Sequence, residues 1–120
     1  MPWVLAVFGL LPLLAGCGGA DCDREPALSW DNFGRGYMET YCTGCHSVLL
    51  DTALERREAT FGVDFNTYGD VMKHVERIEA RGTGESPTMP PSGGPSEAEI
   101  ARLEEWLTCT VHEDAAELEQ

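Results

Sequence analysis

Apolar side chains recur at helical spacing in three parts of the chain, and stretches rich in polar residues, proline or glycine separate these parts. In the first part, after Ser29, four aromatic residues follow at intervals of three and four positions: Trp30, Phe33, Tyr37 and Tyr41. This spacing places them on one face of an amphipathic helix. Ser29 is a favourable N-cap, because its hydroxyl can accept a hydrogen bond from a backbone N–H of the first turn.

The C-terminal part of the chain predicts a second helix. Ser96 and Glu99 have the spacing of a capping box. An apolar stripe follows at Ile100, Leu103, Trp106 and Leu107. We expect this helix to end near Thr108 and an acidic tail with a frayed end to occupy residues 111–120.

Two glycines inside the first helix indicate that another helix approaches it closely. Gly34 and Gly36 each cost about 1 kcal/mol relative to alanine in a helix interior. The absence of a side chain allows a neighbouring backbone or ring to come near, and the C-terminal helix is the expected neighbour. We therefore predict that Trp106 packs against the first helix.

A third helix is predicted over residues 67–81, with five apolar residues on one face: Tyr68, Val71, Met72, Val75 and Ile78. Arg81-Gly82 provides a stop signal. His74 lies beside the apolar face, so a solvated surface histidine is the favoured interpretation and an iron ligand the alternative. Upstream, residues 47–57 contain enough apolar positions for a short helix or a turn.

The chemistry of the chain centres on Cys42-Thr43-Gly44-Cys45-His46, the pattern of a covalent haem attachment site. Two cysteines three positions apart can bond to the two vinyl groups of a haem, and the following histidine can serve as an axial ligand. The competing interpretations of Cys-x-x-Cys are half of a zinc site and a thiol redox pair. The adjacent histidine favours haem.

Residues 82–95 form a loop, because four prolines and four glycines among fourteen residues exclude a helix or a central strand. Met89 is the one large apolar residue in this loop. A lone methionine usually fills a gap in the packing. Here a second role is favoured, because a haem bound by His46 needs a sixth ligand and a thioether favours ferrous iron.

Together these features resemble the small monohaem class I cytochromes c, over about residues 30–109. The resemblance rests on the first helix, Cys42-Thr43-Gly44-Cys45-His46, Met89-Pro90-Pro91, and the closing helix near Trp106. It implies an all-α cytochrome c fold, with three to four helices around one covalently bound haem c and with the N- and C-terminal helices crossing. It also implies that Cys42 and Cys45 bind haem covalently, that His46 is the proximal iron ligand and that Met89 is the distal one.

The N-terminus is typical of an exported protein. Residues 3–15 form an uncharged apolar run, too short and too interrupted for a comfortable membrane span. Leu14-Ala15-Gly16-Cys17 resembles the lipobox of bacterial lipoproteins. The resemblance implies a signal peptide over residues 1–16 and acylation of Cys17. We thus expect a tether over residues 17–28, a cytochrome domain over residues 29–110, and a lipid-anchored location at a membrane surface facing the periplasm.

Two further cysteines form a candidate disulfide. Lipid accounts for Cys17 and haem for Cys42 and Cys45, which leaves Cys22 and Cys109 of the five cysteines. A bridge between leftover thiols is favoured in an exported protein. Two unpaired or intermolecular thiols are the alternative.

The charge of the chain limits its partners. Eight Lys and Arg residues stand against 21 Asp and Glu residues, a net charge of -13, which argues strongly against nucleic-acid binding. Such acidity either keeps the protein soluble or steers it toward redox partners with basic surfaces.

The expected function is that of an electron carrier rather than an enzyme, because two axial ligands leave the iron no open position for a substrate. If Met89 is not a stable ligand, a five-coordinate gas sensor or peroxidase-like protein is the alternative. A structural zinc lipoprotein is a third possibility.

Overall fold

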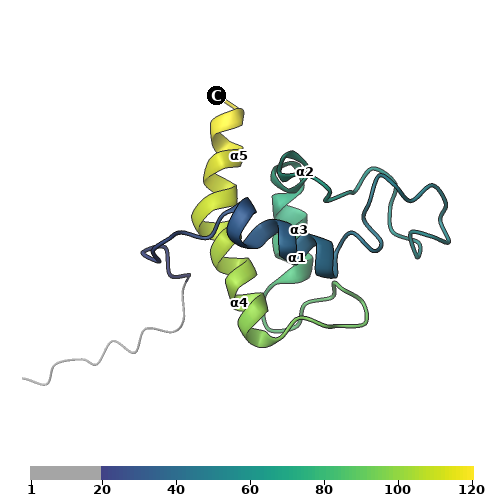
Figure 1. Ribbon diagram of the computed structural model, residues 1–120, viewed down its shortest axis with the longest axis horizontal. Helices are drawn as coiled ribbons and strands as arrows, with labels where there is room; N and C mark the ends of the chain where they lie inside the picture. Colours follow the sequence, from purple (N-terminus) through teal and green to yellow (C-terminus); the bar gives the residue numbers. More distant parts are fainter. Residues whose placement is uncertain (1–19) are drawn as a thin grey trace, which may run out of the picture.

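A computed structural model of the chain describes residues 20–120. All regular secondary structure in these residues is helical, which confirms the predicted all-α class (Figure 1). In chain order the elements are η1 (Trp30–Gly34), α1 (Arg35–Tyr41), α2 (Tyr68–Lys73), α3 (Val75–Gly82), α4 (Glu97–Trp106), η2 (Leu107–Val111) and α5 (His112–Leu118). The expected signal peptide and Cys17 lie outside the described residues.

The first helix begins where the sequence predicts. Ser29 has extended backbone geometry, and its hydroxyl accepts a hydrogen bond from the Asn32 N–H at 3.2 Å. The Asn32 side chain in turn accepts from the Ser29 N–H at 2.8 Å. These reciprocal bonds satisfy donors that would otherwise be free at the first turn. The π-helical turn η1 then continues directly into α1.

The first helix packs against the C-terminal helix through one of its two glycines. Gly34 is buried, and a Cβ on it would overlap the ring of Trp106, which is fully buried. The expected contact of Trp106 with the first helix is therefore confirmed. The explanation is wrong for Gly36, which is exposed and has no heavy atom within 4 Å of its Cβ position.

The C-terminal helix is longer than the sequence predicts. We use this name for α4, η2 and α5 together, which run without interruption from Glu97 to Leu118. The capping box of Ser96 and Glu99 is confirmed, but the predicted end near Thr108 is wrong. Leu107 and Val111 are fully buried, so the apolar stripe continues one turn further. The expected acidic tail, residues 111–120, is helical up to Leu118.

The middle helix is divided in two at His74. Thr67 caps α2 through a capping box with Asp70. His74 then leaves helical geometry, with φ -115° and ψ 17°, and α3 begins at the next residue. The predicted extent is correct and the predicted continuity is wrong. The break still leaves Val71 and Val75 buried, so both short helices cover the core.

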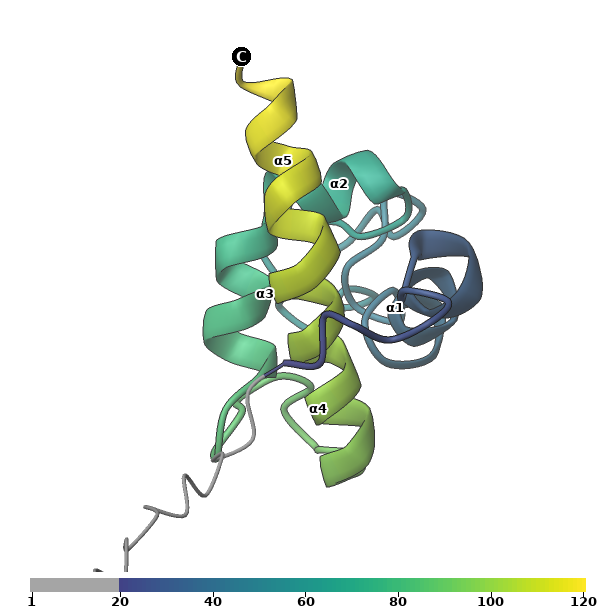
Figure 2. The same ribbon diagram turned by 90° about the vertical axis from the view of Figure 1, so that its left-hand side faces the viewer.

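Residues 47–57 contain turns and no regular helix, in line with the expected short helix or turn. Figure 2 shows α3 lying beside the C-terminal helix, with α1 on the other side of it. The core is formed where these helices meet. No helix among residues 20–120 is long and apolar enough to cross a membrane.

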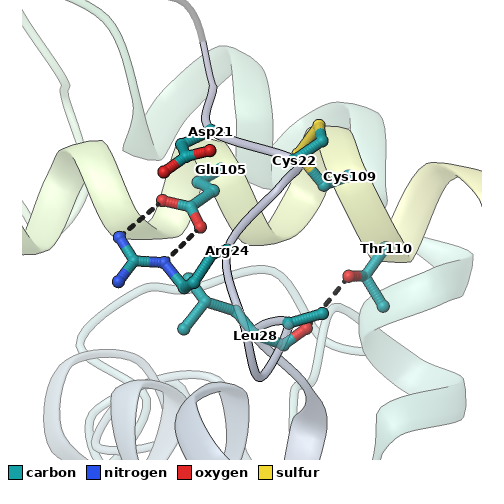
Figure 3. Close-up of a pocket in the computed structure, with 8 residues that line it drawn as sticks. Asp21, Cys22, Arg24, Leu28, Glu105, Cys109 and Thr110 are labelled. Carbon is teal, nitrogen blue, oxygen red and sulfur yellow. Dashed lines mark hydrogen bonds and ion pairs between the residues drawn. A yellow bond between two sulfur atoms is a disulfide. The ribbon is translucent and has the colours of Figure 1, made fainter.

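Residues 20–28, here called the strap, are fixed to the C-terminal helix (Figure 3). Cys22 and Cys109 are joined by a disulfide, with their Cα atoms 5.3 Å apart. The Arg24 guanidinium donates two hydrogen bonds to the Glu105 carboxylate. The disulfide and the ion pair thus fix the strap to the C-terminal helix, although the joined residues lie 87 and 81 positions apart in the sequence.

Candidate haem attachment site

The attachment turn, residues 42–46, follows α1 directly. Cys42 is the C-cap of α1, and its N–H donates to the Met38 carbonyl at 2.9 Å. The N–H groups of Cys45 and His46 both donate to the Cys42 carbonyl, at 3.2 and 2.9 Å. One compact turn therefore holds both cysteines and the histidine. Both thiols are free and half-buried, unlike Cys22 and Cys109, which are bonded to each other.

His46 has one ring nitrogen engaged and one available. Its Nδ1 lies 2.8 Å from the carbonyl oxygen of Val63. A carbonyl oxygen can only accept a hydrogen bond, so Nδ1 carries the proton and Nε2 has a free lone pair. The Phe65 ring lies beside the imidazole, with the ring centroids 4.9 Å apart. A histidine that donates one N–H to a carbonyl and presents the other nitrogen is arranged as a metal ligand.

The environment of Cys42 does not resemble that of a redox-active thiol. Burial, with a smaller contribution from the negative charge of Cys45, raises the pKa of the Cys42 thiol to about 12. Catalytic thiol pairs instead have lowered pKa values, which supply the reactive thiolate at neutral pH. The attachment turn therefore gives the thiol redox interpretation no support.

The zinc interpretation would need further His, Cys, Asp or Glu ligands beside Cys42, Cys45 and His46. Within residues 20–120, no group of three or more His, Cys, Asp or Glu side chains is arranged to hold a metal ion. A structural zinc site needs four such ligands. Haem differs in this respect, because its porphyrin supplies four nitrogen ligands and the protein adds only axial ones.

The loop that carries Met89, residues 83–95, is held at two points. At its middle, the N–H groups of Thr88 and Met89 both donate to the carbonyl of Arg81, just before the loop, at 2.8 and 2.9 Å. Near its end, a Cβ on Gly94 would lie 3.4 Å from the Tyr41 ring. Tyr41 immediately precedes Cys42, so the Met89 loop returns to the attachment turn.

A hydrogen bond between helices strengthens this arrangement. The Tyr41 hydroxyl donates to the Glu99 carboxylate at 2.7 Å, which links the end of α1 to the first turn of α4. Both ends of the Met89 loop are thereby attached to helices of the core. Met89 itself is 38% exposed.

Residues 47–63, between His46 and the carbonyl that it bonds, expose an unusual share of large apolar side chains. Val48, Leu49, Leu54 and Phe61 are each more than half exposed. This loop has no regular secondary structure in which such residues would form a helical face. Exposed apolar side chains in one segment are typical of a surface that another apolar group covers.

A buried arginine holds this loop together. The Arg56 side chain is 1% exposed. It donates to the backbone carbonyls of Ser47, Ala59, Thr60 and Val63, at 2.7 to 3.2 Å. Its Nη1 also lies 2.8 Å from Asp64 Oδ1, an ionic contact without good hydrogen-bond geometry.

The structure distributes the predicted site residues over three places. Cys42, Cys45 and His46 share one turn, and Met89 lies on the loop that returns to that turn. Cys22 of the strap is bonded to Cys109 of the C-terminal helix, beside a cavity of about 10 Å³ that holds at most one water molecule. His74 is half-buried rather than solvated, with its ring edge-on to Phe65 at a centroid distance of 6.0 Å.

Sequence analysis missed Arg56 and the Val63 carbonyl. A backbone acceptor leaves no signal in the sequence, because every residue carries a carbonyl. For Arg56 the available signal was a pair of adjacent arginines, Arg56 and Arg57, in a loop with an aspartate eight positions after the first.

No family model matches this chain, and neither the curated proteins nor the solved structures contain a significant match.

Proposed function

We propose that the protein is a c-type cytochrome that carries single electrons between extracytoplasmic redox partners. One haem c would be attached through Cys42 and Cys45 and ligated by His46 and Met89. The observation that carries the proposal is the attachment turn itself. It combines two free thiols with a histidine whose Nδ1–H is fixed on a carbonyl and whose Nε2 remains available.

The two thiols have the chemistry that covalent attachment needs. Each S–H would add across the C=C bond of one vinyl group to give a thioether, an addition that would consume no external oxidant or reductant. The reaction requires reduced cysteines. In this chain the Cys22–Cys109 bridge occupies the only other two cysteines of the described residues, and Cys42 and Cys45 stay free.

The axial ligands favour electron transfer over catalysis. When bound, the haem supplies an iron that exchanges one electron between the ferric and ferrous states. His46 is oriented by the Val63 carbonyl, and Met89 offers a neutral thioether on a loop anchored at both ends. With both positions filled by protein ligands, no open site remains for a substrate. Such a pair of ligands raises the reduction potential.

The location follows from Cys17. Acylation of this residue would hold the domain at a membrane surface, because each buried CH₂ group contributes about 0.8 kcal/mol. The net charge of -13 suits redox partners with basic surfaces.

The proposal is tested by the reduced and oxidised absorbance spectra of the exported protein. We expect a thioether-type haemochrome spectrum and a haem that resists acid-acetone extraction. The double variant Cys42→Ser/Cys45→Ser should lose the covalent haem. Cys22→Ser/Cys109→Ser is the matched control, because it removes the same number of sulfur atoms and should keep the haem. A colourless wild-type protein that contains zinc would overturn the proposal.

Met89 has its own test. The variant Met89→Ala should lose the near-infrared band of a sulfur–iron bond, acquire CO binding and show a lower reduction potential. The control Met72→Ala changes a methionine that packs against the core and should keep the band. If the wild-type protein already binds CO and lacks the band, the five-coordinate sensor or peroxidase-like alternative is correct.

A further inference from the structure

The guanidinium of Arg56 and the imidazole of His46 share one acceptor. Arg56 Nη2 lies 3.2 Å from the Val63 carbonyl oxygen, and His46 Nδ1 lies 2.8 Å from the same atom. We propose that Arg56 is a positioning residue for His46, which fixes the carbonyl that orients the axial ligand. This inference rests on the proposed function.

The guanidinium connects the two ends of residues 47–63. It bonds the Ser47 carbonyl, next to His46, at 2.7 Å, and it bonds the Val63 carbonyl at the far end. Between them it holds Ala59 and Thr60 at 3.2 and 2.8 Å. In the absence of helix or strand in this loop, one side chain supplies the cross-links that a regular element would otherwise provide.

Only arginine suits this position. Its planar fork carries five N–H donors in fixed directions, whereas lysine has one compact ammonium group on a flexible stem. Charge-assisted hydrogen bonds are also stronger than neutral ones. Four backbone carbonyls accept hydrogen bonds from the three nitrogens of the Arg56 guanidinium. A lysine here would retain the positive charge and lose most of these hydrogen bonds.

The burial of Arg56 indicates that these bonds matter. A buried charge is costly unless it is paired and hydrogen-bonded. Asp64, itself buried, provides the opposite charge, and the Phe61 ring lies 5.0 Å from the guanidinium carbon. Surface ion pairs elsewhere in the chain, such as Arg35 with Asp31, have no comparable set of backbone acceptors.

The role of Arg56 in the site concerns Nδ1 of His46, the ring nitrogen that faces the Val63 carbonyl. A ligating histidine that donates its other N–H to a well-placed acceptor has a fixed ring orientation and a stronger basicity. The Val63 carbonyl supplies this acceptor, and Arg56 holds it at the required place. Loss of the Arg56 guanidinium should therefore loosen the hydrogen bond from His46 Nδ1–H to the Val63 carbonyl, while His46 remains the ligand.

The first readout is proton exchange at His46 in the reduced holoprotein. With ¹⁵N-labelled histidine and tryptophan, the His46 Nδ1–H of the wild type should be protected from solvent. In Arg56→Lys we expect its exchange to be about tenfold faster, the lower end of the effects that outer partners exert on metal sites. Arg57→Lys is the matched control, because this exposed neighbour has no part in the carbonyl cluster and should leave the rate unchanged. The buried indole N–H of Trp106 reports general unfolding and should exchange as in the wild type.

The second readout is the reduction potential, which a merely structural role would not move. Arg56→Lys keeps the charge, so a change reports the hydrogen bond alone. A looser bond makes His46 a weaker donor to ferric iron, and the potential should rise. A tenfold change in the ratio of reduced to oxidised protein corresponds to about 59 mV for one electron. The control Arg57→Lys should keep the wild-type potential.

Unchanged exchange and potential in Arg56→Lys would overturn the inference and leave the proposed function intact. A colourless wild-type protein would instead overturn the proposed function. If Arg56→Lys does not accumulate, Asp64→Asn provides the test. It removes the ionic partner and keeps the carbonyl contacts, so it should speed the His46 exchange in the same direction but less. Wild-type exchange in Asp64→Asn would then reject the role of Arg56.

Discussion

The helical half of the molecule and the half around the attachment turn are held together in different ways. Where α1 meets the C-terminal helix, the side chains of Met38, Leu103 and Trp106 are almost completely buried in one apolar core. Around the attachment turn, polar side chains bond backbone carbonyls, and Leu49 and Leu54 are more than four-fifths exposed. The first half thus obtains its stability from apolar contacts within the chain. The second half is ordered by hydrogen bonds and leaves large apolar side chains exposed.

The contrast is sharpest at Trp106, for which we predict the largest loss of stability. Trp106→Ala should lower the free energy of unfolding by about 3–5 kcal/mol, because it opens a large cavity at the crossing of the helices. Leu54→Ala should change it by less than about 0.5 kcal/mol, since this side chain is exposed. Denaturant unfolding of the haem-free protein, in which Leu54 is exposed, measures both. Equal losses would show that the two halves do not differ as described.

The disulfide of the strap supports the helical half alone. Cys22→Ser/Cys109→Ser should lower the free energy of unfolding by about 2–4 kcal/mol, because the bridge closes a long loop, with a sequence separation of 87. The haem spectrum should stay unchanged, since the attachment turn uses other cysteines. A spectral shift in this variant would show that the two halves are coupled through the strap.

The two glycines of the first helix should respond with opposite sign. Gly34→Ala should destabilise, because a Cβ would overlap the Trp106 ring and overpacking costs about 1–3 kcal/mol. Gly36→Ala should stabilise by about 0.5–1 kcal/mol, because nothing lies near its Cβ and alanine favours a helix. Thermal unfolding of the pair provides the measurement. A stabilised Gly34→Ala protein would contradict the close crossing.

The smallest effect is expected from Glu105 and depends on pH. Hydrogen bonds from Arg24 lower the pKa of the Glu105 carboxyl below its usual value of 4.5. A depressed pKa in the folded state stabilises the fold above the unfolded value, and this contribution is lost as the pH falls through the folded value. Glu105→Gln should therefore be less stable than wild type at neutral pH and approach it below pH 4.5. A difference that stays constant down to acid pH would contradict the ion pair as its source.

The sequence predicted those features that local chemistry determines. The caps at Ser29 and Ser96 and the crossing at Gly34 follow from side chains near in sequence or from one missing Cβ. The break at His74 and the extension through Val111 depend on tertiary packing, which overrides local preference. At the site, the Cys-x-x-Cys-His spacing pointed to a single turn. The hydrogen-bond partner of His46 is the backbone carbonyl of Val63, which Arg56 also contacts, so no residue type in the sequence could predict it.

The position of the strap bears on which way the molecule faces. Figure 1 shows residues 20–28 on one side of the domain and the loop after the attachment turn on the opposite side. Cys17 and the disulfide-bonded Cys22 are five positions apart, a contour of at most about 18 Å. With Cys17 acylated as proposed, a short tether would hold the domain close to the membrane while it diffuses laterally. The attachment turn would then be directed away from the lipid. The surface around the attachment turn, through which the proposed haem would exchange electrons, would then face the aqueous side of the membrane, where soluble partners arrive.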